Sequence, residues 1–416
     1  MKKLKKIISP RTLLLIASVI IFVSSISFIN LPSQSSTQGI VSVLAVDTDG
    51  SQVDVACSII TPTGGRKTKS NVYSAKAPTI AQAIQKVSIQ IGKTLGFAQC
   101  DVVAVGNNIM EQNIVSALDY LTRTRKVNKN VLLLNFDGIA KEFIESVIYI
   151  EENLSLKLSE LLAYNKENIM AIDSSVEKFY LGYYSDSGIS MLPTISLKEE
   201  SENGIQVEVS ASQSSSSLST NTAGGDGESE EKPKKLYLVN DGTASVLKNG
   251  KKISTLYAEE VKNINLFINE STTGTFKLEN VTDKLFDNAT IVMAMEEKDL
   301  NYKYMFKDDT PLIELTIDMY VKVEEIIQEK SEKMLRREDN FITDELVSRL
   351  KEKVEGRLND AVEYMKEKNV DLIEIYNWFN KFNNKKWKNY INSLEDKEDY
   401  IKNVDFKFKI NVAQYL

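Results

Sequence analysis

Two residue pairs have the spacing of a serine nucleophile and a lysine base. Ser175 with Lys178, and Ser229 with Lys232, fit the Ser-x-x-Lys pattern of penicillin-recognising enzymes. The first pair lacks the companion motifs of those enzymes. The second pair lies in a segment rich in Ser, Glu, Gly and Lys. We therefore interpret both pairs as chance matches without nucleophilic chemistry.

Other patterns suggest binding chemistry, but structural roles fit them better. Gly92-Lys93-Thr94 matches the end of a phosphate-binding loop, yet Val87 stands where that loop needs Gly, and the triplet ends a predicted helix. Asp47-Thr48-Asp49-Gly50 resembles a calcium loop, but its flanks are predicted strands and the terminal bidentate Glu is absent. Neighbouring carboxylates such as Glu259-Glu260 point in different directions. The sequence predicts a turn at 47–50 and no nucleotide or metal site.

The composition excludes several function classes. The 416 residues include no histidine, which removes Ser-His-Asp and Cys-His catalysis and His-ligated metals. Two cysteines are too few for Cys-rich zinc or iron–sulfur sites. The net charge is −7 with both signs interspersed, which argues against a nucleic-acid partner. We expect no catalytic, cofactor-binding or metal-binding residues, and no enzyme activity.

The first 30 residues combine a basic end with one apolar run. Lysines and Arg11 lead into Leu13–Ile29, which is broken only by serines. This arrangement directs the N-terminus inward and the body across the membrane. We expect residues 1–30 to be a single-pass anchor of the cell membrane with an extracytoplasmic body. A cleaved signal segment, with Ser25-Ile26-Ser27 as its cleavage site, is the alternative.

The N-terminal domain, residues 39–196, alternates strands and helices. A hairpin is predicted over residues 39–60, helices after Thr79 and near 109–122, and further strands at 101–105 and 130–135. This order predicts a mixed α/β sheet with some parallel pairs. Cys57 and Cys100 fall at apolar strand positions and should be buried, as reduced thiols or as a disulfide.

The composition changes over residues 197–235, which we interpret as a disordered linker. Residues 236–300 follow as a small β-rich middle domain, with tight turns at Asp241-Gly242 and Asn249-Gly250. In the C-terminal domain, residues 301–416, alternating strands at both ends enclose long helices within 327–368. A turn at Asp308-Asp309 pairs the first of these strands with the preceding one, and Leu346, Leu350, Val354 and Leu358 share one helix face. This pattern predicts an α+β domain in which helices cover an antiparallel sheet.

Four segments of the chain follow one another in a characteristic order. They are GIVSVLAVDTDG with QVDVACSIITP, TIAQAIQKVSIQIGKTLGFAQCDVVAVGNNIMEQNIVSALDYLTRTRKV, DGTASVLKNGKKISTLYAEE, and VDLIEIYNWFNKFNNKKWKNY with VDFKFKINVAQYL. Together they resemble the Ger(x)C family, the C subunit of bacterial-spore nutrient germinant receptors. The resemblance spans nearly all of residues 39–416. The chain departs from the family in lacking the usual N-terminal lipidation cysteine, for which the hydrophobic helix is a substitute anchor.

The resemblance implies a three-domain exported protein without known catalysis. It implies partnership with integral membrane germinant-receptor subunits at the spore inner membrane, where this subunit scaffolds or signals during nutrient-triggered germination. The family-motif positions, with structural or partner-contact roles, are Asp47, Arg123, Gly242, Ala244, Glu260, Asp371 and Trp387. The alternatives are an exported binding or sensory protein unrelated to germination, and a cell-wall enzyme that uses carboxylates or a Ser-Lys pair.

Overall fold

The computed structural model describes most of the chain from residue 38 onward. The described ranges are 38–62, 68–124, 127–147, 154–166, 168–170, 172–200, 206–208, 236–269, 271–328 and 342–415. The predicted anchor or signal segment, residues 1–30, and most of the predicted linker, residues 197–235, lie outside these ranges.

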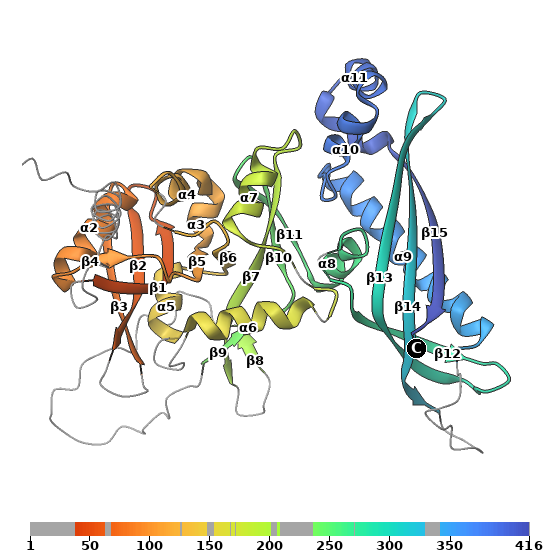
Figure 1. The fold of residues 1–416 in the computed structure, drawn as a ribbon, viewed down its shortest axis with the longest axis horizontal. Coiled ribbons are helices and arrows are strands. Elements are labelled where there is room, and N and C mark those ends of the chain that lie inside the picture. Colours follow the sequence, from red (N-terminus) through yellow and green to blue (C-terminus); the bar gives the residue numbers. More distant parts are fainter. Residues whose placement is uncertain are drawn as a thin grey trace, which may run out of the picture.

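Within these ranges a mixed sheet of 11 strands forms one half of the molecule (Figure 1). Its main order is β11-β10-β7-β6-β5-β1-β2-β3, with β4 beside β1, and β8 and β9 beside β7. β1 pairs in parallel with β4 and β5, and parallel pairing continues through β6 to β7. The strands are β1 (Gln38–Thr48), β2 (Val53–Pro62), β3 (Thr68–Ala77), β4 (Thr94–Gly96), β5 (Val102–Val105), β6 (Leu132–Phe136), β7 (Ile189–Glu200), β8 (Gln206–Glu208), β9 (Leu236–Val239), β10 (Ala244–Lys248) and β11 (Lys251–Leu256).

Helices cover both faces of this sheet. One apolar core joins the sheet to α2, α3, α4 and α7, and a second core joins the opposite face to α5 and α6. β5 and β6 are apolar runs because parallel strands covered on both faces have no solvent side. The helices are α2 (Ile80–Ile91), α3 (Asn107–Gln112), α4 (Ile114–Arg123), α5 (Ala140–Val147), α6 (Leu154–Lys166) and α7 (Val176–Tyr183).

The second sheet has the order β12-β13-β14-β15 in the described part of the chain. Its strands are β12 (Gly274–Val281), β13 (Ala289–Lys307), β14 (Thr310–Ile327) and β15 (Asp405–Gln414). β13 and β14 form a long hairpin that turns at Asp308 and Asp309, both with positive φ. The prediction of a purely antiparallel sheet in this part of the chain is wrong in one respect, because β15 pairs in parallel with β14. The chain crosses the sheet through helices before β15, and it therefore returns in the same direction as β14.

One long helix packs on this sheet. α9 (Asp344–Lys368) buries the face that carries Leu346, Leu350, Val354 and Leu358, as its spacing predicted. Beyond α9 lie α10 (Ile375–Phe382), α11 (Asn384–Ser393) and the 3₁₀ helix η3 (Lys397–Asn403). Figure 1 shows α10 and α11 at one end of the second sheet, beside the tip of the β13–β14 hairpin.

The elements of the predicted middle domain divide between the two sheets. β9, β10 and β11 pair into the large sheet, because β7 offers free hydrogen-bonding edges to β9 and β10. β12 and the first half of β13 belong to the second sheet. α8 (Ala258–Asn265) lies between the two groups. The division into three domains therefore stays a prediction.

A shared apolar core joins the two sheets. The core that contains Phe276, Ile313 and Leu350 also includes Val246 of β10 and Ile169, which follows α6. Ile169 has a positive φ, and its backbone N–H donates to Thr273 O at 3.1 Å. Burial of apolar surface by both sheets in one core couples their stability.

Polar groups complete this junction at the end of α8. The side chain of Lys298 on β13 is buried, and its Nζ donates to Asn265 O and Ile268 O. The Asn265 Nδ2 in turn donates to Ile169 O at 2.8 Å. Since the last carbonyls of a helix lack intrahelical partners, these bonds satisfy groups that would be costly to bury alone.

Replacing Gly274 with Ala tests the packing at this junction. The added methyl group would overlap the side chain of Ile169, so the free energy of unfolding should fall by about 1–3 kcal/mol in urea denaturation. Gly356→Ala is the matched control, since a methyl group there meets open space on α9. It should raise stability by about 0.5–1 kcal/mol. Equal stability of Gly274→Ala and the wild type would contradict a tight junction.

Candidate functional site

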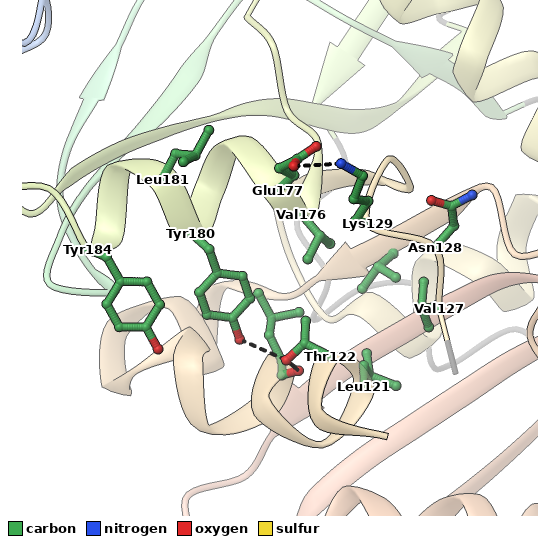
Figure 2. A pocket seen from close by; sticks show the side chains of 12 residues that line it. Leu121, Thr122, Val127, Asn128, Lys129, Val176, Glu177, Tyr180, Leu181 and Tyr184 are labelled. Atoms are coloured by element: carbon green, nitrogen blue, oxygen red, sulfur yellow. Dashed lines mark hydrogen bonds and ion pairs between the residues drawn. The ribbon is translucent and has the colours of Figure 1, made fainter. Parts of the chain in front are cut away.

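An apolar groove lies between α4 and α7 (Figure 2). It encloses about 660 Å³, and its walls are mainly apolar side chains of the two helices and of the loop before β6. Tyr180 and Tyr184 point from α7 toward α4, where Leu121 and Thr122 lie. Tyr184 is 77% exposed and Leu181 is 64% exposed. Two large, exposed apolar side chains on one short helix are typical of a contact surface.

Polar contacts mark two positions along the groove. The hydroxyl groups of Thr122 and Tyr180 lie 3.4 Å apart, and burial raises the pKa of Tyr180. Beyond them the ammonium of Lys129 binds the carboxylate of Glu177 at 2.8 Å. Both hydroxyls stay neutral near pH 7. The groove therefore offers an apolar surface with few polar groups, and its chemistry favours binding of an apolar partner over bond-making.

Local capping fixes the two helices that form this groove. The Asn113 Oδ1 accepts the Val115 N–H at 2.8 Å at the start of α4, which splits the single helix predicted near 109–122 into α3 and α4. The Ser175 Oγ accepts the Lys178 N–H at 3.1 Å at the start of α7. The first Ser-x-x-Lys pair is thus a helix cap, and the second pair lies outside the described residues.

A cleft of about 700 Å³ lies between the two sheets, beside the core that joins them. β7 and α7 form one wall, and β13 and α10 form the other. Tyr304, Trp378 and Phe382 supply stacked rings, and Asp173, Lys178 and Glu374 supply charges. The walls meet where the Asn380 Nδ2 donates to the carboxylate of Asp186 at 3.3 Å. This inter-sheet cleft is therefore bridged by contacts between the two halves.

Asp371 and Trp387 come together behind the cleft. The Asp371 carboxylate is buried and accepts the N–H groups of Ile375 and Tyr376 at 2.8 and 2.9 Å. It also accepts the hydroxyl of Tyr400 at 2.9 Å. The Trp387 ring is fully buried and packs edge-on against Tyr376 and Tyr400. Of the two roles open to Trp387, the structure favours the helix-packing anchor.

Asp47 lies at the carboxyl end of β1, far along the chain from that cluster. Its carboxylate is buried and accepts backbone N–H groups of Thr48 at 2.9 Å, Ile109 at 3.2 Å and Ala140 at 3.4 Å. Burial raises the pKa of Asp47, although the three N–H donors act to lower it. Since Ile109 and Ala140 lie in the first turns of α3 and α5, the carboxylate ties two helix N-termini to β1.

Three further motif positions surround β10 and α8. Gly242 adopts φ of 73°, and a side chain there would meet Met170. Ala244 is buried at the start of β10 between Pro193 and Leu256. Glu260 caps α8 by accepting the Tyr257 N–H at 2.6 Å. These positions serve the junction between the sheets.

Arg123 is exposed at the end of α4, next to the groove. Its guanidinium binds the Asp119 carboxylate at 2.9 and 3.0 Å. The structure therefore brings Asp371 and Trp387 into one cluster and Gly242, Ala244 and Glu260 to the junction, while Asp47 and Arg123 lie apart from both groups. Their assignment as a site stays a prediction.

Other residues singled out in the sequence lie in structural settings. Cys57 and Cys100 are free thiols buried in the same core, as expected for apolar strand positions. Burial raises the pKa of Cys100 to about 12, so its thiol is unreactive near neutral pH. Gly92 ends α2 with φ of 64°. The Asp49 Oδ1 accepts the N–H groups of Ser51 and Gln52, which confirms the predicted turn.

Sequence reasoning missed the groove. Its signal was the run FYLGYY at 179–184, whose aromatic and apolar residues exceed what one buried helix face can hold. The inter-sheet cleft gave no signal, because its walls come from β7, β13 and α10, which are distant in the sequence.

Two family profiles match the chain in order. The profile described as "Spore germination protein N-terminal domain" matches residues 34–197. The profile described as "Spore germination B3/ GerAC like, C-terminal" matches residues 241–413. Together they cover most of the chain, so the chain belongs to the Ger(x)C family of spore germination proteins. This confirms the family indicated by the four sequence segments, and with it a role in spore germination.

Comparison with solved structures finds a protein of similar size. The crystal structure of the GerBC protein matches 90% of this chain and 97% of its own chain, with 14% sequence identity and a TM-score of 0.49. Curated proteins gave no match. Among the helices of the described ranges, none is both long enough and apolar enough to cross a membrane. The predicted anchor within residues 1–30 lies outside those ranges.

The buried carboxylate of Asp371 predicts a pH dependence. Burial raises its pKa above the ordinary value of 3.8. The native protein thus holds this proton more tightly than the unfolded chain. The resulting stability is present below the ordinary pKa and is lost as the pH rises through the folded pKa. Since Asn does not titrate, the stability advantage of the wild type over Asp371→Asn should shrink as the pH rises from about 3.5 to 7.

Urea denaturation at a series of pH values measures this difference. Asp360→Asn, which removes an exposed carboxylate from α9, is the matched control. An advantage of the wild type over Asp371→Asn that grows with pH would show that the hydrogen bonds to this carboxylate outweigh its burial.

Proposed function

We propose that this chain is the non-catalytic, membrane-anchored subunit of a spore germinant receptor. The observation that carries the proposal is the ordered match of both family profiles over residues 34–197 and 241–413. The family supports a complex with other receptor subunits. In this proposal the partners are integral membrane subunits, and residues 1–30 hold the chain at the outer face of the spore inner membrane.

The groove between α4 and α7 is the surface we assign to a partner subunit. Leu181 and Tyr184 are exposed, while Phe179 of the same helix is buried in the core. α7 therefore holds a fixed apolar surface outward. Such a surface suits an apolar helix or loop of a membrane subunit, because association buries the exposed rings and excludes water.

An anchor strengthens this contact without new interactions. Once residues 1–30 hold the chain at the bilayer, the partner subunits are present at high effective concentration. A modest groove affinity is then enough for assembly. The proposed work of this subunit is to hold its partners in a responsive arrangement, and bond-making has no part in it.

Gene deletion in the native spore-forming host tests this proposal. Spores without the gene should form normally but fail to lose refractility when a nutrient is added. The intact gene should restore the response. Unchanged germination with every nutrient, in a strain without redundant receptors, would overturn the proposal.

Complementation with a groove variant tests the assigned surface. Leu181→Lys combined with Tyr184→Lys should slow the nutrient response by about tenfold or more, because loss of apolar anchors at an interface costs about 2 kcal/mol. The control combines Ile89→Lys on α2 with Leu156→Lys on α6, two exposed apolar residues outside the groove. It should restore the response at equal protein level. An equal response of both variants would remove the groove from the partner surface.

A further inference from the structure

The corner formed by α10 and α11 is strongly basic. Residues 375–393 contain four lysines and no acidic residue, which gives a charge of +4 in a chain whose net charge is −7. Lys381, Lys385, Lys386 and Lys388 are all exposed. Within the described residues none of them forms an ion pair, although many other lysines do. These ammonium groups are therefore available to an external anion.

Aromatic rings lie among these lysines. Phe382 is 59% exposed and stacks on the half-buried Trp378, with ring centroids 5.7 Å apart and an interplanar angle of 4°. The Lys381 Nζ lies 5.1 Å from the Trp378 ring centroid and 5.4 Å from that of Phe382. The corner thus combines the exposed ring of Phe382 and the half-buried ring of Trp378, both at the edge of the inter-sheet cleft, with ammonium groups in one surface. We call it the lysine–aromatic corner (residues 375–393).

The corner is held rigidly. Trp387 lies fully buried beneath it and stacks on Phe379 at 4.9 Å. The Asn383 side chain, at the bend between the helices, donates to Tyr304 O at 2.7 Å. Both contacts fix the bend against β13 and the packed interior. The corner lies at one end of the second sheet (Figure 1), where it can meet a flat surface.

Carboxylates also lie near the corner. Four follow α11 at the start of η3, where Glu398 pairs with Lys248 and Asp399 pairs with Lys402; the other two are Glu395 and Asp396. Asp186 accepts a hydrogen bond from Asn380 on the cleft side. Asp308 and Asp309 form the turn of the neighbouring β13–β14 hairpin, and Glu374 precedes α10. The four lysines extend along the bend from α10 into α11, and in the described part of the chain none of these carboxylates forms an ion pair with them.

We propose that the lysine–aromatic corner contacts the surface of an anionic lipid bilayer. Its lysines would bind lipid phosphates, and Phe382 and Trp378 would enter the headgroup region. Protein interfaces are depleted of lysine at their cores. Membrane-surface segments combine lysines with aromatic rings, because the ammonium groups meet anionic headgroups while the rings suit the boundary with the acyl chains. The composition of the corner therefore favours a bilayer over an acidic protein.

This contact goes beyond the proposed receptor role, because it requires only the bilayer and no germination partner. It adds a second point of attachment to the predicted N-terminal anchor. Two attachments at different parts of the chain would fix the orientation of the body over the membrane, which one tether alone leaves free.

The two tryptophans of the chain provide the test, since both lie in this corner. The full chain is reconstituted into vesicles with brominated acyl chains, which quench tryptophan fluorescence on contact. Vesicles that contain phosphatidylglycerol should quench the wild type, while Trp378→Phe, which keeps only the buried Trp387, should stay unquenched. Quenching should disappear at about 1 M salt, where the Debye length is about 3 Å.

Lysine variants test the electrostatic part of the contact. Replacing Lys381, Lys385, Lys386 and Lys388 with Gln should reduce the quenching by about twofold or more, since each lysine near an anionic surface contributes to attraction. The same change at Lys93, Lys251, Lys284 and Lys409, which are exposed elsewhere, should leave the quenching intact. Quenching of the wild type no greater than that of Trp378→Phe would overturn the proposal. Equal quenching in vesicles of phosphatidylcholine alone would also overturn it.

Discussion

The arrangement of this molecule depends on the apolar core shared by its two sheets. Ile169, in the loop after α6, packs against Gly274 at the start of β12. Lys298 and Asn265 satisfy backbone carbonyls at the same place. Neither sheet buries this surface alone, because β10, α8 and α9 each contribute to one continuous core. The junction therefore holds the groove on α7 and the corner at α10–α11 in a fixed relation.

This fixed relation gives the proposed scaffold a physical meaning. The half built on the large sheet presents an apolar groove that suits a partner subunit. The half built on the second sheet presents unpaired lysines beside the rings of Phe382 and Trp378, which suit a bilayer. The buried carboxylates Asp47 and Asp371 serve these surfaces indirectly. Each accepts backbone N–H groups at helix starts and so orders the elements that carry the surfaces. The family membership places this body in spore germination.

Local patterns predicted the elements well, and long-range pairing was harder to predict. The spacing of Leu346, Leu350 and Val354 specified α9, and the Asp308-Asp309 turn specified the long hairpin. The parallel pairing of β15 was missed, because strand alternation does not encode the direction of a neighbour. The joining of β10 to β7 was missed for the same reason. The lysines around Trp387 were visible in the sequence, but which of them stay unpaired depends on neighbours from other elements.

The shared core is tested most directly by measuring whether the two sheets unfold together. Both tryptophans lie on α10 and α11, and both cysteines are buried in the large sheet. Tryptophan fluorescence therefore reports the second sheet, and reaction of the thiols with a chromogenic disulfide reports the first. In urea the two signals should change with one midpoint, as one cooperative body requires. Two separate midpoints would show that the sheets unfold independently and would contradict the account.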